Sequence, residues 1–168
     1  RVLFRSAQTN PILPNNLQEY LLYLMRVAAQ RGEMFVECKY ALTNKLEPLE
    51  IKTDDDWYDE RIWLRVIIDA LHVDGDTAWA LDHKTGKVKE ASDQLMLFAL
   101  VVFVFFPAVN TVHTRYAWLQ FNKWTKKTYT RDDIPWMWQH FVPDLVRFKN
   151  AFKTEIFPAK TSGLCYGW

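Results

Sequence analysis

The sequence predicts an α/β fold: a single domain with a central mixed sheet of four to five strands flanked by helices. Two observations predict it. Segments with the alternation of strands occur at residues 34–42, 61–73 and 77–84, and an apolar segment of helical length at 93–106 is followed by another alternating segment at 111–121. This order predicts an α/β sheet, and 49% apolar residues in a chain of 168 suffice for one core.

A helix is predicted over residues 17–30, where apolar side chains recur at helical spacing. Asn16 is a suitable amino-terminal cap and Gly32 a suitable stop. The strand predicted over 34–42 carries one acid, Glu37, among apolar neighbours. The polar stretch 43–60, which includes three consecutive aspartates, is predicted to form a surface loop or hairpin tip.

The strands at 61–73 and 77–84 are predicted to form a hairpin, because an Asp-Gly-Asp turn signal separates them. The sequence Thr-Gly-Lys follows as a second turn signal at 85–87. The apolar helix then runs over 93–106, and Pro107 ends it.

The fourth strand, at 111–121, is followed by a predicted turn in which three lysines surround Trp124, and residues 129–130 extend a fifth strand. A last helix is predicted over 131–152, with Thr130 as its cap, two aspartates in its first turn, and a break or kink at Pro143. Residues 1–10 resemble foreign or fragment-end sequence. We therefore expect the domain to be residues 11–168, truncated at both ends.

Charge and cysteine content limit the possible partners. The 21 Lys and Arg nearly balance the 20 Asp and Glu, so binding of nucleic acid requires a local patch. The two cysteines, Cys38 and Cys165, cannot form a disulfide framework and fit a reducing cytosol. The longest apolar run, 95–106, is shorter than the roughly 20 residues of a membrane span. We expect no membrane partner and a cytoplasmic location.

Charged residues interrupt two neighbouring apolar strands. Asp69 lies in the strand before the predicted hairpin turn, and Asp82 and Lys84 lie in the strand after it, two residues apart and so on one face. The turn places Asp69 within a residue or two of the position opposite Asp82. Carboxylates near a lysine suit a hard cation such as Mg²⁺ or Mn²⁺. Gln94 opens the next helix and is placed to orient Lys84, and Glu37 is a further acidic candidate.

Two segments carry a resemblance to a known family. The sequence Trp-Ala-Leu-Asp-His-Lys-Thr-Gly-Lys at 79–87, followed by Asp-Gln-Leu-Met-Leu-Phe-Ala-Leu at 93–100, resembles the PD-(D/E)XK nuclease superfamily, in its RecB/Cas4-like, phage exonuclease-like branch. The resemblance covers about residues 34–168. It implies a restriction-endonuclease-like core (αβββαβ) and a Mg²⁺-dependent deoxyribonuclease, of exonuclease type, that acts in phage or microbial DNA recombination, repair or processing.

The resemblance also implies a role for each site residue. The metal ligands are Asp69, Asp82, Glu37 and the main-chain carbonyl of His83; Lys84 is the catalytic lysine and Gln94 the helix-borne glutamine. Phe98 stands where the branch usually has a tyrosine. Some relatives hold an iron–sulfur cluster, which needs four thiolates. Only Cys165 lies in the corresponding region, so no cluster is expected in this chain.

DNA is the expected partner, together with a helicase or recombination protein. The candidate contacts to its backbone are Lys87, Lys123, Lys126 and Lys127, with Trp124 able to stack on a base. A solvated hairpin turn is the other interpretation of the last three lysines. The alternative function is a non-catalytic or partner-dependent DNA-binding module on the same fold.

Overall fold

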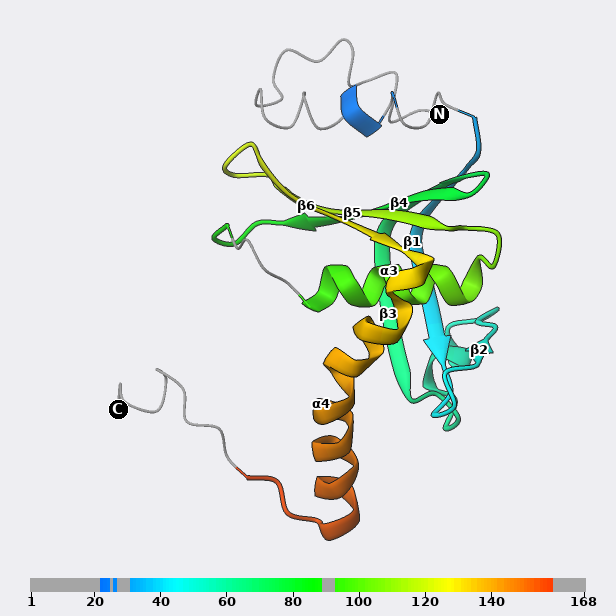
Figure 1. Cartoon of the computed structure of the whole chain (residues 1–168), viewed down its shortest axis with the longest axis vertical. Helices are drawn as coiled ribbons and strands as arrows, with labels where there is room; N and C mark the ends of the chain where they lie inside the picture. The colour runs from blue at the N-terminus through cyan, green and yellow to red at the C-terminus, as the bar shows by residue number, and fades with distance from the viewer. Residues whose placement is uncertain (1–21, 25, 27–30, 89–92, 159–168) are drawn as a thin grey trace. The chain divides into compact units, whose positions relative to one another are not determined.

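The structure is a computed structural model that describes residues 22–24, 26, 31–88 and 93–158 (Figure 1). The chain forms two compact units, one ending at Asp132 and the other beginning at Asp133. The elements of the first unit are the strands β1 (Glu33–Leu42), β2 (Pro48–Leu49), β3 (Leu64–Asp74), β4 (Thr77–Lys84), β5 (Thr111–Trp118) and β6 (Lys123–Thr130), the 3₁₀ helix η1 (Asp55–Tyr58) and the helix α3 (Asp93–Phe105).

The strands form one mixed sheet in the order β2-β1-β3-β4-β5-β6. Strands β4 and β5 are parallel, and each other neighbouring pair is antiparallel. Helix α3 makes the crossover connection that a parallel pair requires and lies against one face of the sheet (Figure 1). The predicted α/β class with a mixed sheet is confirmed; among the residues that the structure describes, the sheet has six strands, more than the four to five predicted.

The β3–β4 hairpin forms as its turn signal predicts. Its ladder runs from Asp74 opposite Thr77 to Ala70 opposite Leu81, and Gly75 at the turn has a φ of +59° that favours glycine. Strand β4 has the predicted bounds. Strand β3 begins three residues later than the predicted start at residue 61, because residues 59–63 form a turn and an irregular approach.

Strand β1 begins directly after a close approach of two backbones. Gly32 has a φ of +106°, and a Cβ at this position would lie 2.2 Å from the carbonyl oxygen of Val73. The helix predicted to precede it, 17–30, is described only at 22–24 and 26, and these residues are helical. The rest of that prediction lies outside the described residues, as does Cys165.

Two loop predictions need correction. Residues 43–60 contain β2 and η1 rather than loop alone. Lys123, Lys126 and Lys127 do not surround a turn: they belong to β6, and the turn lies at 119–122. Strand β6 is at the edge of the sheet. Edge strands often carry exposed lysines, which oppose pairing with another chain, so the composition of β6 is similar to that of a solvated turn.

The core lies between α3 and the sheet. Helix α3 is apolar all round, and most of its side chains are buried. The largest fully buried side chains in this region include Phe98, Phe103, Leu71, Leu95, Leu100, Val101 and Val112.

The carboxyl end of α3 is capped by a side chain from after β6. The Arg131 guanidinium donates hydrogen bonds to the carbonyls of Phe103, Phe106 and Val109, at 2.5–3.3 Å. A cation suits a helix carboxyl end, where carbonyls lack partners within the helix.

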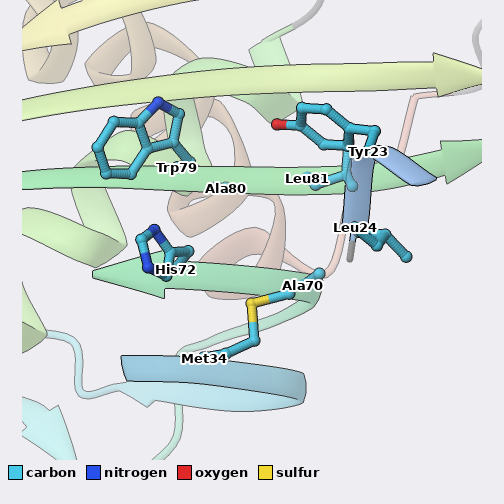
Figure 2. A pocket seen from close by; sticks show the side chains of 8 residues that line it. All are labelled: Tyr23, Leu24, Met34, Ala70, His72, Trp79, Ala80 and Leu81. Atoms are coloured by element: carbon cyan, nitrogen blue, oxygen red, sulfur yellow. The ribbon is translucent and has the colours of Figure 1, made fainter. Parts of the chain in front are cut away.

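The opposite face of the sheet holds a second, smaller cluster. Ala70, Leu81 and Ala117 are buried there, and Tyr23 and Met34 pack against them. Figure 2 shows the narrow pocket beside this cluster, with Tyr23 lying over β4. Its volume of about 10 Å³ is the size of one water, so it has no room for a ligand.

The second unit is built on the helix α4 (Ile134–Thr154), which the short 3₁₀ helix η2 (Arg131–Asp133) precedes. The prediction began this helix at 131, and the expected Thr130 cap is instead the last residue of β6. Helix α4 continues through Pro143 rather than ending there. In the described part of the chain, no helix combines the length and hydropathy that crossing a bilayer requires.

Candidate active site

A closed network of polar side chains lies at the carboxyl end of β4. Asp82 and Lys84 are two residues apart on this strand, so they project from the same face, and Lys84 Nζ lies 2.7 Å from Asp82 Oδ2. Gln94, in the first turn of α3, bridges them. Its Nε2 donates to Asp82 Oδ1 at 3.1 Å, and its Oε1 accepts from Lys84 Nζ at 3.1 Å. Three of the residues that the sequence singled out, Asp82, Lys84 and Gln94, are therefore in contact.

Tyr116 is a fourth member of this network, and sequence reasoning missed it. The β4–β5 register places it directly beside Asp82. Its hydroxyl donates to Gln94 Oε1 at 3.0 Å, and its ring centroid lies 4.9 Å from Lys84 Nζ, within cation–π range. The sequence feature that could have identified Tyr116 is the helix between β4 and β5, because a helical crossover makes β5 a parallel neighbour of β4.

Asp69 lies beside the network, on β3. The β3–β4 ladder ends with Ala70 opposite Leu81, and Asp69 is the next residue beyond that end, in contact with His83, the neighbour of Asp82. The structure thus has Asp69 where the predicted hairpin puts it. Its Oδ2 accepts the main-chain N–H of His83 at 2.8 Å and lies 3.0 Å from His83 Nδ1. These contacts fix the carboxylate at the point where the ladder stops.

The environment of Asp82 disfavours its charged form. The residue is only 6% exposed, and burial raises the pKa of its carboxyl, an effect that the contacts with Lys84 and Gln94 oppose and the charge of Asp69 reinforces. Asp82 Oδ2 is buried without a hydrogen bond of regular geometry among the described residues, although Lys84 Nζ is close to it. Burial also lowers the pKa of His83.

Glu37 is not part of the network. It lies on β1 between Val36 and Cys38, which pair with Ala70 and Ile68, so it is level with Asp69; its side chain is exposed. Its φ of +52° is in the left-handed region, which is unusual for a glutamate in a strand. In the part of the chain that is described, no three His, Cys, Asp or Glu side chains are grouped so that they could hold a metal.

The donor set can nevertheless be compared with the needs of a divalent cation. Mg²⁺ is commonly held by one or two carboxylates and keeps several waters. Asp69 and Asp82 are two such carboxylates, and the buried Asp82 Oδ2 is an oxygen without a regular hydrogen bond. Both supply oxygen donors only, the ligand type that Mg²⁺ or Mn²⁺ prefers, and the family resemblance implies the main-chain carbonyl of His83 as a further oxygen.

The predicted DNA-contact lysines lie outside the network. Lys87 is exposed in the segment after β4, and Lys123, Lys126 and Lys127 are exposed on β6. Lys126 is opposite Arg115 in the β5–β6 ladder, whereas Asp82 is beside Tyr116, the next residue. Because neighbouring strand residues face opposite ways, Lys126 and Asp82 project from opposite faces of the sheet.

Comparison with known proteins adds no family assignment to this geometry. No protein-family model matches the chain, and a search of curated proteins finds no relative. Membership of the PD-(D/E)XK superfamily therefore stays a prediction from the two motif segments.

Proposed function

We propose that this chain is a metal-dependent DNA nuclease of the RecB/Cas4-like PD-(D/E)XK type, which hydrolyses phosphodiester bonds with water as the nucleophile. One observation carries the proposal: a buried carboxylate, Asp82, is held between the Lys84 ammonium and the Gln94 amide beside a second carboxylate, Asp69.

Such an arrangement is costly for a fold. A buried ion pair often contributes no more stability than apolar side chains of the same volume, because both charges lose their hydration. The buried neighbours at these ends of β4 and β5 include Leu81, Ala117 and Trp118, so packing alone does not require a buried carboxylate there. A cluster of charged groups with a perturbed pKa is more typical of functional sites.

Each residue can be given a role in hydrolysis. Asp69 and Asp82, with the carbonyl of His83, would hold the cation. Bound Mg²⁺ or Mn²⁺ supplies a Lewis acid and lowers the pKa of a coordinated water. Lys84 Nζ donates hydrogen bonds to the attacking water or to the developing charge on the phosphate. Gln94 positions Lys84, and Tyr116 positions Gln94.

The near-neutral charge of the chain bears on its partners. With a formal net charge of +1, affinity for DNA comes from a few local cations and falls with salt. This supports action alongside a helicase or recombination protein that delivers DNA, in recombination, repair or genome processing. The proposal includes exonuclease action, which only the family resemblance supports.

Cleavage of end-labelled single- and double-stranded DNA tests the proposal. We expect cleavage with Mg²⁺ or Mn²⁺ and none with EDTA. Lys84→Ala and Asp82→Ala each lower the rate by about 100-fold or more, because each removes a group that stabilises transition-state charge. Lys52→Ala is the matched control, since Lys52 is an exposed lysine paired with Glu50. Undiminished cleavage by both site variants would overturn the site.

The second candidate, a non-catalytic DNA-binding module on the same fold, is favoured by one observation: Glu37 does not join Asp69 and Asp82 as a third acidic ligand. Titration calorimetry with Mn²⁺ separates the two functions. Binding of Mn²⁺ that Asp82→Ala abolishes supports the nuclease. DNA binding without Mn²⁺ binding and without cleavage supports the module.

A further inference from the structure

An open pocket of about 330 Å³ lies against the β5–β6 hairpin. Its lining combines three cations with two aromatic rings, and it consists of Leu22, Tyr23, Arg26, Arg115, Asn122, Trp124 and Lys126. The register of β5 and β6 places it on the face of the sheet opposite Asp82, so it is distinct from the polar network at the end of β4.

The cations of this pocket are arranged at a cost to the fold. Arg115 and Lys126 are directly opposite each other in the antiparallel β5–β6 ladder, and like charges in that position repel. Arg26 brings a third positive charge to the same pocket. Among the described residues, no carboxylate lies within ion-pair distance of any of the three. An anionic ligand would offset this repulsion.

The aromatic rings identify the kind of anion. Tyr23 and Trp124 lie against each other with ring centroids 5.0 Å apart, and Ala117 opposite Trp124 shows that Trp124 projects from the same face as Arg115. Tyr23 also accepts a hydrogen bond from Arg115 at 2.7 Å, which fixes the guanidinium at the pocket wall. Cations beside aromatic side chains are the combination that binds unpaired nucleotides.

We propose that this pocket binds one nucleotide of a single DNA strand, with its phosphate on Arg26, Arg115 and Lys126 and its base against Trp124. This rests on the proposed function for the identity of the substrate, and it adds a strand-binding site remote from the reacting phosphate. A single strand is favoured over a duplex because a base stacked within a duplex cannot reach Trp124.

Binding is tested with the full chain and a fluorescent oligothymidylate by anisotropy, in EDTA so that no cleavage occurs. We expect Arg26→Gln and Lys126→Gln each to weaken binding about fivefold near 0.1 M salt, and each to reduce the slope of log affinity against log salt by about 0.7. Lys52→Gln, the control, leaves affinity and slope unchanged. Thermal melting checks that each variant is folded.

The base contact is tested separately with Trp124→Leu. We expect this variant to bind oligothymidylate about tenfold more weakly and to bind an abasic strand of equal length as the wild type does. Wild-type affinity in both cation variants would overturn the pocket, and equal weakening of both strands by Trp124→Leu would overturn the base contact. Neither result depends on cleavage. If the chain binds oligothymidylate through this pocket but never cleaves DNA, only the proposed nuclease function is refuted. If the chain cleaves DNA and the pocket variants bind as the wild type does, only the pocket proposal is refuted.

Discussion

Tyr116 on β5 lies directly beside Asp82 in the parallel β4–β5 ladder, and its hydroxyl donates a hydrogen bond to Gln94 on α3. A residue from β5 thus supports the amide that holds both Asp82 and Lys84. The polar network is consequently a product of the sheet topology as well as of the β4 motif.

Removing the hydroxyl of Tyr116 tests this support. Tyr116→Phe keeps the ring beside Lys84 but removes one hydrogen-bond donor to Gln94 Oε1. We expect the free energy of unfolding in urea to fall by about 1 kcal/mol and DNA cleavage to slow by about tenfold, because Tyr116 orients Gln94. Tyr58→Phe is the control, because Tyr58 is 77% exposed. A cleavage rate as high as that of the control would remove Tyr116 from the site.

The buried carboxyl of Asp82 predicts a pH dependence of stability. Its pKa is raised above 3.8, mainly by burial, so the folded chain binds this proton more tightly than the unfolded chain. The associated stability is fully present below pH 3.8 and is lost as the pH rises through the folded-state pKa. Relative to Asp82→Asn, the wild type should therefore lose stability over that window. Urea titrations at several pH values measure it, and a constant difference between the two proteins would contradict the prediction.

The cap on α3 predicts a strong effect of one half-buried cation, Arg131. Arg131→Met leaves the carbonyls of Phe103, Phe106 and Val109 without their donor. We expect a loss of about 3 kcal/mol in the free energy of unfolding, since charge-assisted hydrogen bonds to backbone groups are lost. Arg61→Met, which removes an exposed arginine paired with Asp59, should cost less than 1 kcal/mol. Similar losses in the two variants would show that the cap contributes little.

The backbone of Glu37 predicts a stabilising substitution. A left-handed φ of +52° costs a glutamate about 1 kcal/mol that glycine does not incur. Glu37→Gly should therefore raise the midpoint of thermal unfolding, whereas Val36→Gly, at an exposed neighbour without a positive φ, should lower it. If cleavage also falls in Glu37→Gly, the carboxylate contributes to the active site despite its exposure.

The sequence predicted best where local signals are strong. Strand β4 was predicted to the residue because a turn signal bounds each end, and the Asp82–Lys84 contact follows from spacing within that strand. Tyr116 could not be found in this way, because its place beside Asp82 depends on a parallel pairing between segments separated by a helix.

The lysines of β6 show a different limit. Their composition suits a solvated turn and an edge strand equally well, and only the pairing of β6 with β5, in which Lys126 is opposite Arg115, reveals which is present. The sequence offers Lys126 and Trp124 as candidate DNA contacts, but it does not show that they share a pocket with Arg26 and Arg115, because these residues are far apart in sequence and show no common pattern.

The single parallel ladder among the described strands has a consequence for dynamics. Strands β1, β3 and β4 are joined by antiparallel pairing on one side of it, and β5 with β6 on the other. The network spans this junction, with Asp82 and Lys84 on one side and Tyr116 on the other. A local opening between β4 and β5 would therefore dismantle the network while both antiparallel halves stay folded. Amide hydrogen exchange along that junction would report how often the site is intact.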